Sequence, residues 1–166
     1  MSIPAVVIGA SGYVGGELLR LIAGHPQFEL KAAVSDSAAG KPVGELFAHL
    51  GMALAGHTFV AHADWLDHVD ANADLALFSA APHGASAAML ASAIERCEAR
   101  GINVHVVDSS ADFRFAEQGD WEAVYKLEHG APALLDKFVC ALPVHASTVE
   151  TPQVGHPGCF ATASSL

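Results

Sequence analysis

The chain has little positive charge. Its 166 residues contain 8 Lys and Arg against 18 Asp and Glu, which gives a formal net charge of -10. Because nucleic acids are bound through surfaces rich in Lys and Arg, we expect no nucleic-acid partner. The charge balance is compatible with a small anionic ligand, since a few local donors suffice to hold a phosphate on an acidic protein.

Cysteines, histidine clusters and long apolar runs are also scarce. The three cysteines, Cys97, Cys140 and Cys159, have no Cys-X-X-Cys spacing, so they indicate neither a disulfide framework nor a zinc site. The ten histidines are scattered, and no metal site is predicted. No stretch approaches the ~18 uninterrupted apolar residues of a membrane span, and no basic region precedes the first apolar run. We therefore expect a cytoplasmic protein with no membrane partner.

The residues that are present favour a folded α/β domain. Hydrophobic residues make up 52% of the chain and charged residues 16%, which allows a sizeable core. Strand-like and helix-like segments alternate, as they do in βαβ units. Strands are predicted at residues 5–8, 29–34, 58–61, 75–78, 104–107 and 138–142. Helices are predicted at 17–23, at 85–100, within 120–135 and after the turn at 156–159. The pattern predicts a Rossmann-type, doubly wound, mainly parallel sheet with the start of a second domain at its C-terminal end.

The first strand runs directly into a glycine loop. Gly9, Gly12 and Gly15 follow a GxxGxxG spacing, a variant of the dinucleotide-binding fingerprint. Such glycines permit a tight turn and close backbone approach, and the following helix presents free N–H groups to a pyrophosphate. Ser11 adds a hydroxyl donor. The alternative is an ordinary strand–turn–helix corner, but the strand before the loop and the helix after it favour the dinucleotide site.

The segment after the second predicted strand bears on which dinucleotide is bound. It contains Ser35, Asp36 and Ser37, with Lys41 a few residues further on. Two hydroxyls and an ammonium group can surround a 2′-phosphate, whereas a carboxylate aimed at the same point would repel it. If Asp36 points away the pattern favours NADP, and if it points inward it favours NAD. A merely solvated loop is the alternative, and NADP is the favoured prediction.

Cys159 follows a Pro-Gly turn. A cysteine in the first turn of a helix lies near the positive end of the helix dipole, which favours the nucleophilic thiolate. The alternative is a structural cysteine, which the positions of Cys97 and Cys140 also fit. Spacing alone leaves both interpretations of Cys159 open.

Taken together, these motifs resemble those of the N-acetyl-γ-glutamyl-phosphate reductases, within the wider semialdehyde dehydrogenase family. The resemblance covers essentially the whole chain. It rests on GASGYVGGELLRL at 9–21, SDSAAGK at 35–41, PHG at 82–84, DSSADFR at 108–114 and PGCFAT at 157–162.

The resemblance implies an NADPH-dependent reduction of an acyl phosphate through a cysteine thioester, in arginine biosynthesis. It implies that Cys159 is the nucleophile and that residues 1–150 form the NADP-binding domain, with 151–166 opening a catalytic and substrate domain. The expected pyrophosphate-binding residues are Gly9, Ser11, Gly12, Tyr13 and Val14. Ser35 and Ser37 are expected near the 2′-phosphate, and Pro82 and His83 near the nicotinamide. Arg114 is expected either to bind the anionic substrate or to form a structural ion pair.

Three departures from the family pattern stand out. His156 replaces the usual Asn before Pro-Gly-Cys, and Val144 stands where many members have Glu. The resemblance also places a catalytic histidine and most substrate contacts in a C-terminal domain that this chain lacks. We therefore expect a fragment that binds cofactor without turnover, from an enzyme that forms a homo-oligomer.

Two other functions stay open. One is the carrier-linked aminoadipyl or glutamyl phosphate reductase of lysine biosynthesis, which the strong negative charge disfavours because its carrier is acidic. The other is a non-catalytic NADP-binding sensor module, which would have no need of a reactive thiol at Cys159.

Overall fold

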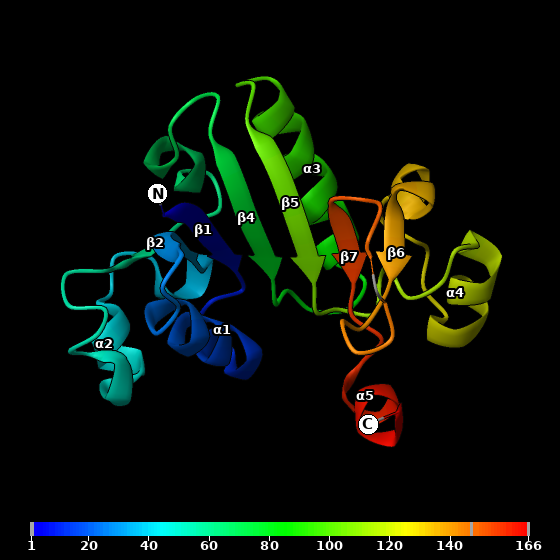
Figure 1. The fold of residues 1–166 in the computed structure, drawn as a ribbon, viewed down its shortest axis with the longest axis horizontal. Helices are drawn as coiled ribbons and strands as arrows, with labels where there is room; N and C mark the ends of the chain where they lie inside the picture. The colour runs from blue at the N-terminus through cyan, green and yellow to red at the C-terminus, as the bar shows by residue number, and fades with distance from the viewer. Residues whose placement is uncertain (1, 147, 166) are drawn as a thin grey trace.

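The sheet determines the architecture of this protein. The computed structural model describes residues 2–146 and 148–165. Within them, seven strands form one sheet in the order β3-β2-β1-β4-β5-β7-β6, and every neighbouring pair is parallel (Figure 1). The strands are β1 (Ile3–Ile8), β2 (Phe28–Val34), β3 (Phe59–Val60), β4 (Asp74–Ser79), β5 (Asn103–Asp108), β6 (Phe138–Cys140) and β7 (Gln153–Gly155).

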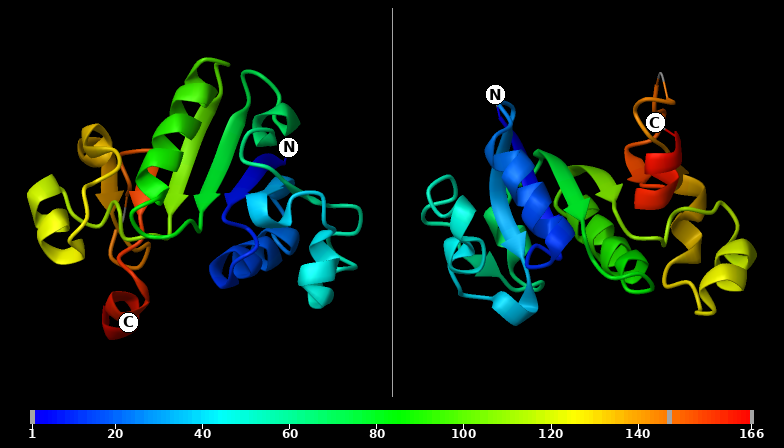
Figure 2. Two further views of the ribbon diagram at one scale, coloured as in Figure 1. Left: turned by 180° about the vertical axis from the view of Figure 1, so that it is seen from behind. Right: turned by 90° about the horizontal axis from the view of Figure 1, so that it is seen from below.

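Helices connect the strands on both faces of the sheet. The α-helices are α1 (Tyr13–Ala23), α2 (Val43–Leu46), α3 (Ser86–Glu98), α4 (Gln118–Tyr125) and α5 (Cys159–Ser165). Short 3-10 helices are η1 (Asp36–Ala38), η2 (Ala48–Leu50), η3 (Trp65–His68) and η4 (Pro132–Lys137). Figure 2 shows α3 lying across the rear of β4 and β5, on the opposite side from the view of Figure 1.

Alternation along β1 divides the core into two layers. Val6 and Ile8 pack with α3, whose Leu90, Ile94 and Cys97 follow helical spacing along one buried face. Residues Ala5 and Val7 point to the other face, where Leu19 and Ile22 of α1 cover them. Helices on both faces of a parallel sheet define the doubly wound fold, so the predicted fold class is confirmed.

Most predicted elements are found, with shifted bounds. The first helix starts at Tyr13, four residues earlier than predicted, because Gly12 acts as its N-cap and the rest of the loop is already helical. Part of the expected loop at 35–44 forms η1 and the start of α2. The short strand β7 was not predicted, and it pairs with both β5 and β6. The sheet therefore extends past residue 150, the boundary predicted between the two domains.

All strands end at one edge, and the loops that carry the predicted site residues meet there. The order reverses between β1 and β4, since β1 leads to β2 on one side and β4 leads to β5 on the other. In open parallel sheets this switch point is where ligands bind, outside the carboxyl ends of the strands. The loops after β1, β2, β4, β5 and β7 are therefore the place to look for a site.

No helix in the described part of the chain is long and apolar enough to cross a bilayer.

Candidate functional site

Two glycines of the loop have no room for a side chain. Gly9 has φ +74°, and a Cβ at this position would lie 2.6 Å from the carbonyl oxygen of Ala80, in the loop after β4. A Cβ on Gly15 would lie 2.6 Å from the Cα of Ala10. The first constraint holds the loop against β4, and the second lets α1 pack directly on the loop. Gly9 therefore permits the tight turn, and Gly15 permits the close approach of the helix, as the fingerprint predicts.

Gly12 has a different role, because the space beside it is open. A Cβ there would meet only the Gly9 oxygen, at the ordinary distance of 3.5 Å. Gly12 is the N-cap of α1, and the first N–H groups of an α-helix have no partner within the helix. Tyr13 is 97% exposed and Val14 is exposed beside it. This cradle of bare backbone suits the pyrophosphate of a dinucleotide.

Three serine hydroxyls link the glycine loop to the end of β2. The Oγ atoms of Ser11 and Ser35 lie 2.7 Å apart, and those of Ser35 and Ser37 lie 3.3 Å apart. Beside them is a hollow of about 270 Å³ whose lining is Ser11, Ser37, Ala38, Lys41, Glu45 and Leu46. Hydroxyls and an ammonium group on one wall form a donor set that fits a phosphate, while Glu45 contributes a carboxylate to the rim.

Asp36 lies between these serines in sequence but takes another direction. Its Oδ1 accepts a hydrogen bond from the backbone N–H of His62, at 2.8 Å. The residue lines a separate hollow of about 280 Å³ and is not part of the serine hollow. The carboxylate is thus turned from the predicted 2′-phosphate position toward the segment after β3.

Pro82 and His83 lie in the loop after β4, at the switch point, and both are exposed. The Nδ1 atom of His83 accepts the backbone N–H of Ala111, at 2.9 Å. This bond requires an unprotonated Nδ1, so the neutral ring carries its hydrogen on Nε2. The ring centroid is 6.3 Å from that of Tyr125, which brings the loops after β4 and β5 together.

Asp112 joins these two loops, and sequence reasoning did not single it out. Its carboxylate accepts the backbone N–H groups of Gly84, at 2.7 Å, and Ala87, at 2.9 Å. Nearby, Asp108 accepts the hydroxyls of Ser86 and Ser110. Burial raises the pKa of Asp108, although these hydrogen bonds oppose the shift. The only sequence signal for this network was the run of polar residues directly after a buried strand.

The turn before Cys159 is closed by the imidazole of His156. Its Nδ1 accepts the backbone N–H of Gly158 at 3.0 Å, and its Nε2 lies 3.3 Å from the hydroxyl of Thr162. The Thr162 hydroxyl donates in turn to the Gly158 carbonyl, at 2.7 Å. An Asn side chain can make the same bond to the N–H two residues on, so His156 can perform the turn chemistry of the Asn that the family resemblance leads us to expect here. Cys159 is then the first residue of α5, and it is exposed.

Arg114 is hydrogen-bonded to the same turn. Its Nε donates to the His156 carbonyl at 3.1 Å, and one Nη donates to the Tyr125 hydroxyl at 3.3 Å. A Cβ on Gly158, where φ is +101°, would lie 3.0 Å from the guanidinium carbon. The structure therefore gives Arg114 a bracing role next to Cys159, and its binding of substrate stays a prediction.

The His156 bond makes the turn sensitive to pH. Burial, and then the charge of Arg114, lower the pKa of His156 below its usual value. The neutral ring is therefore favoured by folding, and its contribution is complete above the unfolded pKa of about 6.5. As the pH falls below that value toward the lower folded pKa, the unfolded chain binds the proton first and the contribution is lost. We expect the melting temperature to fall between pH 7.5 and 5.5, and to fall less in His156→Asn, which keeps an acceptor but does not titrate. Identical pH profiles for the two proteins would contradict this role.

The other two cysteines differ from Cys159. Cys97 is fully buried on α3, and burial raises its pKa to about 11, so it fits the structural role expected of it. Cys140 is exposed at the end of β6, although its place in an apolar strand had favoured a structural role. Across residues 2–146 and 148–165, no three His, Cys, Asp or Glu side chains gather as ligands for a metal ion.

Comparison with known proteins identifies the family. The family model described as semialdehyde dehydrogenase, NAD binding domain, matches residues 4–150. The chain belongs to this family. The predicted dinucleotide-binding domain is thus confirmed, and the glycine loop, the serine hollow and the switch-point loops lie within the matched residues.

Several curated relatives are similar over nearly the entire chain. It is 40% identical to the N-acetyl-gamma-glutamyl-phosphate reductase of Streptomyces coelicolor, over 100% of this chain and 45% of that protein. It is 37% identical to the reductase of the same name from Saccharophagus degradans, over 96% and 44% respectively. A LysW-linked 2-aminoadipate and glutamate phosphate reductase of Aeropyrum pernix is 36% identical, over 99% and 44%. The chain spans less than half the length of these relatives.

Among solved structures, the aspartate semialdehyde dehydrogenase of Candida albicans, determined with NADP, has a similar fold. The TM-score is 0.50 at 23% identity, over 71% of this chain and 32% of that one. This likeness supports the doubly wound architecture.

Proposed function

We propose that this chain is the cofactor-binding, thiol-bearing part of an NADPH-dependent reductase that acts on N-acetyl-γ-glutamyl phosphate. The observation that carries the proposal is that one sheet edge holds both a phosphate-type hollow after β2 and an exposed cysteine after β7. The names of the relatives from Streptomyces coelicolor and Saccharophagus degradans supply the substrate.

The preference for NADP over NAD rests on the directions of Asp36 and the serines. The carboxylate that would bind the ribose 2′-hydroxyl of NAD is instead bonded to the His62 backbone. Ser11, Ser37 and Lys41 line the serine hollow and offer donors in its place. A dianionic 2′-phosphate gains charge-assisted hydrogen bonds in such surroundings, whereas a hydroxyl gains much less.

The double variant Ser37→Ala/Lys41→Ala tests this preference. Hydrogen bonds to charged groups contribute about 1.5–3 kcal/mol, so we expect NADPH affinity to fall roughly 10- to 100-fold. NADH affinity should stay within about twofold, because NADH has no 2′-phosphate for Ser37 and Lys41 to bind. Dissociation constants from isothermal titration calorimetry would measure both. Lys31→Ala is the matched control, since Lys31 pairs with Glu29 on β2 and lies outside the hollow. Equal losses for the two dinucleotides would contradict the assignment.

The proposed chemistry begins at Cys159. Its Sγ attacks the acyl carbon of the substrate, and a C–S bond forms. The bond from this carbon to the bridging oxygen of the phosphate breaks, and inorganic phosphate leaves. NADPH, when bound, supplies the hydride that reduces the resulting thioester. Collapse of the reduced adduct breaks the C–S bond, releases the aldehyde and regenerates the thiolate. The turn made by His156 and Gly158 orients the thiol, and Arg114 holds the turn in place.

The carrier-linked reaction is the second candidate, because the Aeropyrum pernix relative is nearly as similar as the others. The net charge of -10 disfavours it, since an acidic carrier protein would be repelled. Assaying the complete enzyme with free N-acetyl-γ-glutamyl phosphate separates the two. NADPH oxidation with the free substrate supports the first candidate, and turnover only with a carrier-bound substrate supports the second.

A further inference from the structure

A second hollow lies beside the serine hollow at the same sheet edge. Its volume is about 280 Å³, and its wall runs from the end of β1, across the end of β2, to the loop after β4. The lining is Ile8, Gly9, Val34, Ser35, Asp36, Ser37, His62, Ala81, Pro82 and Met89. Most of these side chains are apolar or small, and two, Asp36 and His62, have groups suited to hydrogen bonding with a heterocycle.

These two residues are held together by a bond that leaves one carboxylate oxygen available. Asp36 Oδ1 accepts the His62 backbone N–H at 2.8 Å. In the described part of the chain, no hydrogen bond reaches Oδ2 of Asp36. The carboxylate is therefore oriented by one oxygen and can act as an acceptor through the other.

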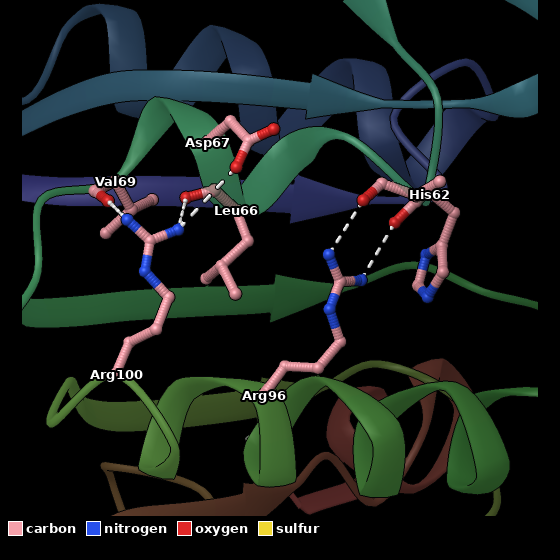
Figure 3. Close-up of polar contacts among 7 residues, drawn as sticks. His62, Leu66, Asp67, Val69, Arg96 and Arg100 are labelled. Atoms are coloured by element: carbon pink, nitrogen blue, oxygen red, sulfur yellow. Dashed lines mark hydrogen bonds and ion pairs between the residues drawn. The ribbon is translucent and has the colours of Figure 1, made fainter.

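Arg96 of α3 holds the backbone at His62, as Figure 3 shows. Its two Nη atoms donate to the carbonyls of His62, at 3.2 Å, and Ala63, at 2.7 Å. One turn further along, Arg100 donates to the carbonyls of Leu66 and Val69. The segment after β3 is thus fastened to α3 and to the turn that follows it. It forms a fixed wall rather than a loose loop, as a preorganised binding site requires.

The His62 imidazole is neutral in this setting. Burial lowers its pKa, and Arg96 acts in the same direction, while Asp36 opposes the shift. Its Nδ1 atom is buried and has no hydrogen-bond partner among the described residues. A neutral, planar ring at the wall of an apolar hollow suits a neutral aromatic base better than a charged group.

We propose that Asp36 and His62 recognise the adenine base of the dinucleotide. The free Oδ2 of Asp36 accepts a hydrogen bond from the exocyclic amino group, and the His62 ring forms one wall for the base. This inference rests on the proposed dinucleotide binding and adds a recognition role to it. It gives Asp36 a binding role in a chain whose ribose position is lined by serines. Pro82 also lines this hollow, so the inference places Pro82 beside the adenine and not beside the nicotinamide, where the family resemblance had placed it.

The variant Asp36→Asn tests the carboxylate with two ligands. They are NADP⁺ and its hypoxanthine analogue, in which a carbonyl oxygen replaces the adenine amino group. Wild-type protein should bind NADP⁺ about tenfold more tightly, because the carboxylate would face an acceptor in the analogue. In Asp36→Asn the amide oxygen keeps the His62 bond and the NH₂ group takes the place of Oδ2. Because an NH₂ group donates to the hypoxanthine oxygen, we expect the preference to vanish or invert.

Two histidine variants distinguish the contribution of the His62 ring from that of the Asp36 carboxylate. His62→Ala should weaken both dinucleotides by a similar factor of about ten and leave their ratio unchanged, since its backbone N–H still orients Asp36. His68→Ala is the matched control, because His68 is exposed on η3 outside the hollow, and it should change neither affinity. An unaltered wild-type ratio in Asp36→Asn would overturn the inference. Wild-type protein that binds neither dinucleotide would overturn the proposed function, and this inference with it.

Discussion

Replacing Gly9 with alanine should abolish measurable dinucleotide binding and lower the free energy of unfolding by about 3 kcal/mol. Two separate costs add at this position. The backbone has φ +74°, in the left-handed region, which disfavours any residue with a Cβ. The new methyl group would also lie 2.6 Å from the Ala80 oxygen, which is backbone and cannot rotate away. Relief of this contact requires the loop after β1 to separate from the loop after β4, and the dinucleotide site lies between them.

Gly56→Ala is the control that separates the two costs. Gly56 has φ +87°, but nothing lies within 4 Å of the position its Cβ would take. This variant should lose only about 1–2 kcal/mol, from the backbone conformation alone, and should keep its affinity for NADPH. Chemical denaturation and calorimetric titration of both variants would measure the difference. If the two variants lose equal stability and bind NADPH equally well, the close contact between Gly9 and Ala80 is not what builds the site.

The features that were predictable from sequence are those governed by local pattern. The residues from Val6 to Gly15 already contain a buried strand, a turn that needs glycines and a helix start, so the fold class and the dinucleotide-binding domain were predicted together. The helix predicted at 85–100 is likewise found as α3, and Leu90, Ile94 and Cys97 lie on its buried face. In each case the signal that predicts the element lies in residues close together in the chain.

The features that were not predictable depend on contacts between distant segments. Strand β7 has three residues, and it is a strand only because β5 and β6 flank it. The bond from Asp36 to the His62 backbone joins residues 26 apart, and it decides the direction that the sequence left open. Arg114 is 42 residues from the carbonyl of His156 that it binds. A motif match can propose a ligand for such an arginine but cannot show that the cysteine turn already uses it.

Contacts between distant segments also hold parts of the candidate site in place. Sequence motifs marked separate points along the chain: a glycine loop, a serine segment and a cysteine turn. The structure shows that two of the surrounding segments are held by charged residues from elsewhere in the chain: Asp36 and Arg96 fix the segment after β3, and Arg114 fixes the turn after β7. Rigid support of this kind keeps binding groups in place before a ligand arrives, which lowers the entropic cost of binding.

Cys159 should react with iodoacetamide at least 100-fold faster than Cys97 in the folded protein. Cys159 is exposed at the first residue of α5, whereas Cys97 is fully buried. Because burial raises the pKa of Cys97 to about 11, only about one Cys97 side chain in a thousand is a thiolate at pH 8, and the reagent has no access to it. Cys140 is the matched control, since it is also exposed but follows no glycine turn. Mass spectrometry of peptides after timed alkylation would give the three rates, and Arg114→Ala should slow Cys159 alone by loosening its turn.

In the complete enzyme, Cys159→Ser should reduce turnover by at least about 1,000-fold while NADPH affinity stays within about twofold. A serine hydroxyl is deprotonated far less readily than a thiol, so no thioester forms, and the turn that carries residue 159 keeps its hydrogen bonds. Cys140→Ser should keep full activity. The decisive measurement is a pre-steady-state burst of phosphate release on mixing enzyme and acyl phosphate without cofactor. A burst in wild type that is absent in Cys159→Ser supports the covalent route, whereas a burst that persists in the variant would remove Cys159 from the reaction.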